Sequence, residues 1–337
     1  MKAYVIAAGS TSVESLRRVE RPEPQAGPRE VVIRVRATSL NYRDHLVMTG
    51  AYFGKPIDRD LVPLSDGAGE VASVGAEVKR LKVNDRVAGT FFQTWVDGPL
   101  GWSRPALGGT QDGMLAEFVA LHEDGVVAVP AGLSFEEAAA LPCAGVTAWH
   151  ALMDSGARVK AGDTVLCLGT GGVSMFAVQF AKLAGARVII TSSSDEKIAR
   201  ACALGAAEGI NYRQNPDWEK AVRALTNGRG VDHIVEVGGV GTLARSFKAL
   251  AFGGKIASIG VLAGSKGDAN PVSLMMKGGS LHGIYVGSTA MFEEMNRAIS
   301  LNGIKPLVDK VFSFEQAGDA YRCMASGEFM GKIVITV

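Results

Sequence analysis

The stretch Thr164–Lys197 constrains this chain most strongly, because an apolar strand, a run of glycines, a helix and a second apolar strand follow one another there. Val165–Leu168 is short and wholly apolar, as is typical of a strand buried on both faces of a parallel sheet. The glycines at 169, 171 and 172 let the backbone approach a pyrophosphate, and the next helix offers free N–H groups at the positive end of its dipole. The stretch therefore predicts a dinucleotide-binding site rather than a purely structural strand–helix–strand unit.

The glycine loop departs from the common G-x-G-x-x-G pattern at Ser174, which stands where the third glycine would be. A small residue still fits the close packing of helix against strand that this position requires. The residues predicted to contact the pyrophosphate are Gly171, Gly172, Val173 and Ser174.

The end of the second strand bears on the choice of cofactor. Proteins that prefer NAD usually place an acidic residue about 20 residues beyond the glycines, where it accepts hydrogen bonds from ribose hydroxyls. Here the strand ends in Thr191–Ser194, and Lys197 lies nearby. Hydroxyls and an ammonium suit the oxygens and negative charge of a 2′-phosphate, so Ser192, Ser193 and Lys197 predict NADPH.

An ordinary helix start explains the same residues without a phosphate. Ser194 is a good N-cap residue, Asp195 and Glu196 lie favourably in the first helical turn, and Lys197 is then simply solvated. The two interpretations are compatible, because a cap residue and a phosphate ligand can be neighbours. Asp195 is the residue that would reverse the prediction if its carboxylate bound the ribose.

Length, charge and cysteine content narrow the class of protein. At 337 residues the chain suits two domains, and its formal net charge of +1 gives no indication of a nucleic acid partner. The N-terminus lacks the apolar region of a signal peptide, and no window approaches the roughly 18 apolar residues of a membrane span. Four cysteines are scattered without a disulfide framework. We therefore expect a cytoplasmic protein without membrane association.

The two expected domains differ in their pattern of apolar residues and glycines. Residues 1–125 show short alternating strands and frequent glycines, which predict an all-β domain. A capping box at Ser134 and Glu137 opens a helix that Pro142 interrupts. Residues 126–289 predict a doubly wound α/β domain, and residues 290–337 add a helix and a final strand that packs back on the first domain. The strands expected in the α/β domain are Thr164–Leu168, Arg187–Thr191, Gly209–Asn211, Val231–Val237, Lys255–Ile259 and Leu281–Val286, and the tail strand is Lys332–Val337.

Four segments taken together resemble one known family: Gly67–Gly75, Val83–Val87, Gly113–Phe118 and Leu141–Ala148. The first two resemble a G-x-G-x-V-x-x-V-G…GDRV signature, with Asn84 for the usual glycine. On these motifs nearly the whole chain resembles the medium-chain dehydrogenase/reductase superfamily, especially its zinc-free quinone oxidoreductase-like and zinc-type alcohol dehydrogenase-like members. The resemblance implies an α/β fold in which a Rossmann domain binds NAD(P), a GroES-like β domain carries the substrate side, and an active cleft lies between them.

Zinc-dependent members of that family hold a catalytic ion with a cysteine, a histidine and a further cysteine or aspartate. The matching positions here look like Asn41, Ser65 and Cys143, with Asp66 at a nearby acidic position. A thiol, an amide and a hydroxyl make a poor zinc site, although His45 and Asp66 are conceivable substitutes. The four cysteines of the family's structural zinc are missing from residues 91–112. The resemblance therefore predicts no zinc.

The missing metal ligands favour particular substrates. Without a Lewis acid, an unactivated alcohol or ketone is a poor substrate, whereas quinones and α,β-unsaturated carbonyls accept hydride more readily. We therefore expect an NADPH-dependent oxidoreductase that transfers hydride to such a small molecule. Two alternatives stay open: an alcohol dehydrogenase or carbonyl reductase of the same family, and a non-catalytic NADPH-binding protein with a sensing or RNA-binding role.

The resemblance implies four catalytic candidates. Asn41 could hydrogen-bond a developing oxyanion, or it could be a turn residue after a strand. Tyr52 could donate a proton or merely line the pocket. Asp44 could orient groups near the nicotinamide or pair with Arg43, and Thr147 resembles a threonine that touches the nicotinamide.

The resemblance also implies cofactor contacts outside the glycine loop. Lys197 and Tyr212 resemble a pair that contacts the 2′-phosphate, and Tyr42 could pack near the nicotinamide. We expect a homodimer formed near Leu281–Val286, and we expect His233 to be a satisfied core residue. The other positions expected near the cofactor are Val237, Gly238, Val261, Leu262, Val286, Gly331 and Lys332.

Overall fold

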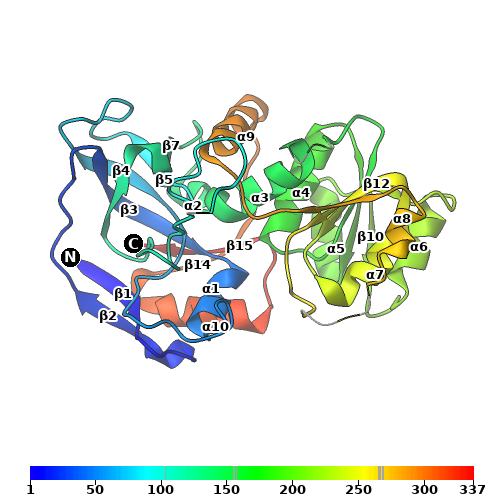
Figure 1. Ribbon diagram of the computed structural model, residues 1–337, viewed down its shortest axis with the longest axis horizontal. Helices are drawn as coiled ribbons and strands as arrows, with labels where there is room; N and C mark the ends of the chain where they lie inside the picture. Colours follow the sequence, from blue (N-terminus) through cyan, green and yellow to red (C-terminus); the bar gives the residue numbers. More distant parts are fainter. Residues whose placement is uncertain (103, 155, 157, 265–266, 268) are drawn as a thin grey trace. The chain divides into compact units, whose positions relative to one another are not determined.

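The computed structural model describes residues 1–102, 104–154, 156, 158–264, 267 and 269–337. The chain forms two compact units (Figure 1). Unit 1 comprises Met1–Val146 and Gly287–Val337, and unit 2 comprises Thr147–Val286. The fold class is therefore α/β with two units, as the sequence predicted.

Unit 1 is built on a seven-stranded sheet in which β14, β15, β3, β4, β5 and β7 follow one another and β6 pairs with β3; β1 and β2 form a separate pair. The strands are β1 (Lys2–Ile6), β2 (Leu16–Glu20), β3 (Glu30–Leu40), β4 (Asp66–Val74), β5 (Arg86–Gly89), β6 (Phe118–His122), β7 (Val126–Ala128), β14 (Val308–Phe312) and β15 (Lys332–Thr336). The helical segments are η1 (Val13–Ser15), α1 (Tyr42–Met48), η2 (Glu123–Gly125), α2 (Phe135–Ala139), η3 (Leu141–Gly145), α9 (Thr289–Asn302), η5 (Phe314–Gln316) and α10 (Ala317–Ser326).

The boundary between the units differs from the one expected after residue 125. Residues 126–146 belong to unit 1 because β7 extends the sheet by pairing with β5, and because α2 packs against β3 and β4. The tail also joins unit 1, where β15 pairs antiparallel with β3. This pairing confirms that the final strand packs back on the first domain.

Unit 1 is not the all-β domain that the first 125 residues predicted, because α1 follows β3 directly. Asn41, at the N-cap of α1, donates its backbone N–H to the Asp44 carboxylate at 2.8 Å. Short polar side chains around a helix start favour this local structure over a simple turn. The helix places Asn41, Arg43 and Asp44 at the end of the central strand of the sheet.

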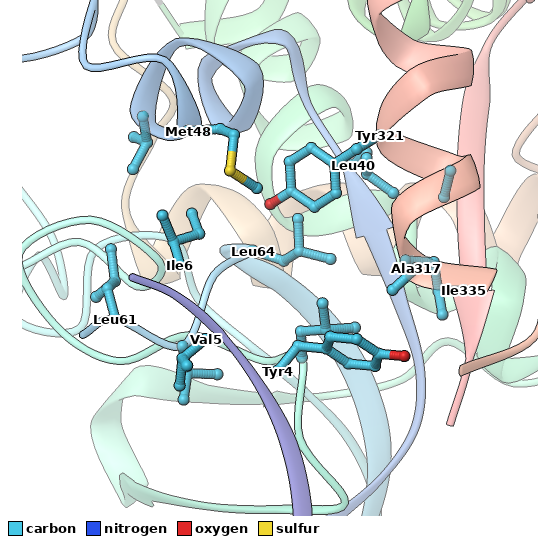
Figure 2. Close-up of a cluster of buried hydrophobic side chains, with 14 of the residues drawn as sticks. Tyr4, Val5, Ile6, Leu40, Met48, Leu61, Leu64, Ala317, Tyr321 and Ile335 are labelled. Carbon is cyan, nitrogen blue, oxygen red and sulfur yellow. The ribbon is translucent and has the colours of Figure 1, made fainter. Parts of the chain in front are cut away.

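A hydrophobic core joins the N-terminal strand, α1 and α10 within unit 1. Figure 2 shows Tyr321 projecting from α10 toward Met48 of α1, with Leu64 and Tyr4 nearby. The Tyr321 ring is almost completely buried, and its hydroxyl has no hydrogen-bond partner among the residues that the structure describes. Residues from both ends of the chain therefore support the short helix that carries the site residues.

Unit 2 contains a six-stranded sheet in the order β10–β9–β8–β11–β12–β13, with every neighbouring pair parallel. This is the strand order of a doubly wound dinucleotide-binding sheet, and Figure 1 shows helices packed around it. Its strands are β8 (Thr164–Cys167), β9 (Arg187–Ser192), β10 (Glu208–Asn211), β11 (Val231–Glu236), β12 (Leu250–Ser258) and β13 (Ser280–Gly283). Its helices are α3 (Val146–Trp149), which begins at the boundary, η4 (His150–Asp154), α4 (Gly172–Leu183), α5 (Asp195–Leu204), α6 (Trp218–Leu225), α7 (Val240–Ala249) and α8 (Val272–Met275).

Local signals in the sequence are also confirmed. Ser134 and Glu137 form the expected capping box at the start of α2, and Pro142 lies in the π-helical segment that separates α2 from α3. The six strands expected in the α/β domain all form, with ends shifted by a few residues. None of the helices in the described part of the chain combines the length and the apolar character that a bilayer crossing requires.

Candidate functional site

The glycine loop of unit 2 leaves its backbone open between β8 and α4. Gly169 has a φ of +71°, a conformation that favours glycine, and Gly171 is the N-cap of α4. A Cβ atom built on either glycine would meet no heavy atom within 4 Å. The first turn of α4, from Gly172 to Ser174, presents backbone N–H groups as an anion site requires. The loop therefore fits the pyrophosphate of a dinucleotide.

Ser174 has a structural explanation that the sequence did not provide. Its side chain is buried, and its hydroxyl donates a hydrogen bond to the Leu168 carbonyl oxygen at 2.7 Å. The serine thereby joins the first turn of α4 to the end of β8 at the position where a third glycine usually allows close packing.

The carboxyl ends of the parallel strands bring several predicted cofactor residues to one edge of the sheet. The backbone N–H of Tyr212, just after β10, donates to the Ser192 carbonyl oxygen at 3.0 Å. The backbone N–H of Leu262 donates to the Val237 carbonyl oxygen at 3.3 Å. Ligands of doubly wound sheets bind outside this edge, so these four residues lie where a cofactor contact was predicted.

Asp195 is engaged with neighbouring amides. One carboxylate oxygen accepts a hydrogen bond from Asn211 Nδ2 and the other from Gln214 Nε2, each at 2.8 Å. Ser194 caps α5 by accepting from the backbone N–H of Lys197, as the alternative interpretation of this segment expected. The cap and its acidic first turn are present, and each oxygen of the Asp195 carboxylate already accepts one hydrogen bond, from the last residue of β10 or from the loop that follows it.

Glu236 is a buried carboxylate at the end of β11 that the sequence analysis missed. It accepts hydrogen bonds from the backbone N–H groups of Gly238 and Gly239 and from the hydroxyls of Thr242 and Ser246. Burial raises the pKa of this carboxyl, and these donors oppose the rise. An acidic residue at the end of a buried strand, just before two glycines, was the available signal. Glu236 fixes the turn that carries the predicted contact Gly238.

Val286, the last residue of unit 2, has a φ of +57°, which is rare for a β-branched residue. Its carbonyl oxygen accepts a hydrogen bond from His150 Nδ1 at 2.7 Å, which fixes the strained backbone. Strained residues concentrate at functional sites.

His233 is buried and lies 3.1 Å from an Asp163 carboxylate oxygen, which confirms it as a satisfied core residue.

In unit 1, four segments far apart in the sequence meet around the Asp66 carboxylate. One Asp66 oxygen accepts from the Ser65 hydroxyl at 2.7 Å, and the other accepts from the Cys143 backbone N–H at 3.2 Å. The Lys332 ammonium lies 3.5 Å from that second oxygen and donates to Asn41 Oδ1 at 2.6 Å. Each of the family's zinc-ligand positions is therefore part of one hydrogen-bonded cluster.

Arg43 and Asp44 add a second pair of buried charges from α1. The Arg43 guanidinium lies 3.2 Å from Asp44 Oδ1 and donates to the Leu107 carbonyl oxygen. It also packs over the rings of Tyr52 and Phe91, at 5.1 and 4.8 Å from their centroids. Burial raises the pKa of the Asp44 carboxyl to about 6, although the Arg43 charge opposes the rise. The predicted pairing of Asp44 with Arg43 is present, and the same guanidinium packs against the Tyr52 ring.

The remaining predicted residues lie at different kinds of position. Tyr42 is exposed beside His45, and Thr147 is the buried first residue of unit 2. Gly331 has a φ of +75°, and a Cβ there would approach the Leu307 carbonyl oxygen to 2.4 Å, so the turn before β15 requires glycine. The others lie in unit 2: Val173 in α4, and Ser193, Tyr212 and Val261 after strands.

The donor set of the Asn41 cluster does not suit a zinc ion. It offers the Asn41 amide, the Ser65 hydroxyl, the Asp66 carboxylate and the Cys143 thiol, and burial raises the pKa of that thiol above its usual value. The Lys332 ammonium lies among these groups and would repel a divalent cation. Elsewhere in the part of the chain that the structure describes, no group of three or more His, Cys, Asp or Glu side chains is arranged to hold a metal.

Comparison with known proteins identifies the family. Residues 27–131 match the alcohol dehydrogenase GroES-like domain, and residues 172–301 match the zinc-binding dehydrogenase family. A zinc-type alcohol dehydrogenase-like protein of Schizosaccharomyces pombe is 42% identical, covering 99% of both chains. A quinone oxidoreductase of Pseudomonas aeruginosa is 32% identical, covering 98% of this chain and 97% of the relative.

Solved structures agree with this assignment. The crystal structure of an NAD-dependent alcohol dehydrogenase is 35% identical and superposes with a TM-score of 0.92, covering 100% of each chain. The sequence resemblance to quinone oxidoreductase-like and alcohol dehydrogenase-like enzymes is therefore confirmed. The chain belongs to the medium-chain dehydrogenase/reductase superfamily and is an oxidoreductase with a GroES-like unit and a Rossmann unit.

Proposed function

We propose that this protein is an NADPH-dependent reductase that transfers hydride to a quinone or an α,β-unsaturated carbonyl compound without a catalytic zinc ion. The observation that carries the proposal is the Lys332 ammonium among the family's zinc-ligand positions, 2.6 Å from Asn41 Oδ1 and 3.5 Å from the Asp66 carboxylate. A fixed positive charge occupies the interior where zinc-dependent relatives gather metal ligands.

The nature of the hydride acceptor follows from that charge. A catalytic zinc polarises a carbonyl or lowers the pKa of an alcohol, which simple ketones and alcohols need. A conjugated acceptor spreads the developing charge over several atoms and needs less stabilisation at its oxygen. A neutral hydrogen-bond donor such as the Asn41 amide is then adequate, because one such donor contributes on the order of 10²–10³ in rate.

NADPH is favoured over NADH by the residues after β9. Asp195 is the acidic residue that the sequence analysis named as the alternative ribose ligand, and each of its oxygens already accepts a hydrogen bond, one from Asn211 and one from Gln214. Small hydroxyls at the end of β9 and the lysine in the first turn of α5 suit a 2′-phosphate. The open backbone at Gly169 and Gly171 supports pyrophosphate binding in either case.

Bound NADPH would supply the hydride at C4 of its nicotinamide. The residues of this chain position the acceptor and stabilise charge on its oxygen. Asn41 Nδ2 donates a hydrogen bond to that oxygen, and Tyr52, held by cation–π packing against Arg43, borders the acceptor.

Turnover and metal content test the proposal directly. Purified protein should oxidise NADPH with a quinone or an enone, should turn over simple ketones poorly, and should keep its rate after treatment with a chelator. Stoichiometric zinc whose removal abolishes activity would instead establish an alcohol dehydrogenase of the same family. Tight NADPH binding without turnover of any acceptor would support the non-catalytic alternative.

The phosphate preference has its own test. Changing Lys197 to Ala should weaken NADPH by about tenfold or more and leave NADH affinity nearly unchanged, because only NADPH carries the 2′-phosphate. Lys220→Ala, an exposed lysine paired with Asp217 in the same unit, is the matched control. Equal losses for both cofactors in the Lys197 variant would contradict the phosphate role.

A homodimer is the expected assembly. β13 is the edge strand of its sheet, and Leu281 on that strand is exposed, as are Phe252, Met275 and Met276 in the same unit. Among the described residues β13 pairs only with β12, and an edge strand in a unit that exposes apolar side chains suits pairing with a second copy of the chain. Light scattering coupled to size-exclusion chromatography distinguishes a dimer from a monomer.

A further inference from the structure

Lys332 is a buried lysine whose ammonium is fully used inside unit 1. It is 2% exposed at the start of β15. Its Nζ donates to the Leu40 carbonyl oxygen at 2.7 Å and to Asn41 Oδ1 at 2.6 Å, and the Asp66 carboxylate lies 3.5 Å away. An ammonium has three N–H donors, and these three oxygens match them.

The lysine determines which way the Asn41 amide points. An ammonium only donates hydrogen bonds, so the atom of the amide that faces it must be the oxygen. The Nδ2 group then points away from Lys332. It is buried and has no acceptor among the described residues, whereas most buried donors in proteins do have one.

We propose that Lys332 is a positioning residue that holds Asn41 Oδ1 so that Nδ2 presents its N–H to a carbonyl oxygen of the bound reactants. This inference rests on the proposed function, because it requires a carbonyl-bearing ligand in unit 1. The acceptor oxygen belongs either to the substrate or to the nicotinamide carboxamide, and both have the same hydrogen-bonding chemistry.

The surrounding charges explain why a lysine can serve here. Lys332 and Arg43 bring two positive charges, and Asp44 and Asp66 bring two negative ones, all nine-tenths buried or more. Their sum is zero, so the ammonium is compensated without a bound ion. Lys332 contacts the uncharged amide of Asn41, and the Nδ2 donor of that amide is the group left for a ligand.

A cycle of variants separates positioning from simple structural support. Lys332→Met combined with Asp66→Asn removes both charges together, and the amide introduced at position 66 keeps an oxygen for the Cys143 backbone N–H. We expect kcat to fall by about tenfold or more in this variant and by about 100-fold in Asn41→Ala. Combining Lys332→Met and Asp66→Asn with Asn41→Ala should cause no further loss of kcat, because Lys332 acts through Asn41. Losses that multiply in the combined variant would overturn the proposal.

A second variant tests the proposal if the Lys332→Met, Asp66→Asn double variant does not fold. Asn41→Asp keeps an oxygen facing Lys332 but replaces the Nδ2 donor with an acceptor, so its kcat should fall as far as that of Asn41→Ala. Wild-type kcat in Asn41→Asp would overturn the proposal. Lys310→Met, an exposed lysine on the neighbouring strand β14, is the control and should retain wild-type activity.

The affinity for NADPH identifies which oxygen accepts the hydrogen bond, and the choice of substrate separates failure of this inference from failure of the proposed function. NADPH affinity without a second substrate should fall in Asn41→Asp if the oxygen is the carboxamide, and only kcat should fall if it is the substrate carbonyl. If wild-type protein turns over a simple alcohol rather than an enone or quinone, the proposed function fails, and the cycle is measured on that alcohol. The positioning role is then judged by the same non-additivity.

Discussion

The two units hold their candidate site residues in opposite ways. In unit 2 the glycine loop is open, with no atom within 4 Å of a Cβ built at Gly169 or Gly171. In unit 1 the site residues are themselves part of the interior. Asp66 and Lys332 are 0% and 2% exposed, their charged groups lie 3.5 Å apart, and Lys332 donates a hydrogen bond to Asn41. An open site can change without loss of stability, whereas a site built from buried charges cannot.

The largest expected effect is on unit 1, from changing Asp66 to Ala. The substitution leaves the Lys332 ammonium without its counter-charge and the Cys143 backbone N–H without its acceptor. Removing one partner of a buried ion pair costs about 3–5 kcal/mol of the free energy of unfolding. Urea denaturation measures the loss, and the exposed Asp58→Ala should change stability by less than about 0.5 kcal/mol. A loss below about 1 kcal/mol would show that the cluster is not part of the core.

The next largest effect is a pH dependence of the free energy of unfolding, which arises from Asp44 in unit 1. Burial raises the pKa of this carboxyl from 3.8 to about 6, so the folded state binds a proton more tightly than the unfolded state. The resulting stability is fully present below about pH 4 and is lost as pH rises through about 6, by at most about 3 kcal/mol. An asparagine at this position cannot titrate. The free energy of unfolding of wild type should therefore fall relative to that of Asp44→Asn as the pH rises from 4 to 7. A difference that stays constant with pH would contradict the raised pKa.

The same contrast explains what the sequence could predict. The Rossmann strands of unit 2 lie in apolar runs separated by glycines and helices, and the predicted cofactor residues lie at or just after the ends of those strands. Local pattern was therefore enough to place Gly171 and Ser192. It also placed the capping residue Ser194, although nothing local indicated that Asn211 would engage Asp195.

The unit 1 cluster could not be assembled from pattern in this way. Asn41, Asp66 and Lys332 come from distant segments and meet because β3, β4 and β15 pair in one sheet. Cys143 of η3 joins them through its backbone N–H, which donates to the Asp66 carboxylate. Family resemblance pointed to Asn41, Ser65 and Cys143 as metal-ligand positions, with Asp66 beside them, and to Lys332 as a cofactor contact. The ion pair that joins them depends on strand register, which single-sequence periodicity does not specify.

Changing Gly171 to Ala tests the open site of unit 2. The added methyl group meets no protein atom, so the free energy of unfolding should change by less than about 0.5 kcal/mol. The pyrophosphate needs close backbone approach, so NADPH should bind about tenfold more weakly, as measured by fluorescence titration. Gly101→Ala, also open and without a positive φ, is the control. Loss of stability without loss of affinity would reverse the comparison between the units.

The smallest expected effect separates two roles within the glycine loop itself. Ser174 lies only three residues after Gly171, yet its hydroxyl donates to the Leu168 carbonyl oxygen at 2.7 Å and the side chain is buried. Changing Ser174 to Ala should therefore cost about 1 kcal/mol of unfolding free energy, the usual contribution of one hydrogen bond, and leave NADPH affinity unchanged. Ser174→Gly, which restores the common glycine pattern, should cost about 1 kcal/mol more, because glycine is a poor helix former. If Ser174→Ala instead weakens NADPH as much as Gly171→Ala does, the hydroxyl serves the cofactor, and this side chain belongs to the open site rather than to the packing of α4 on β8.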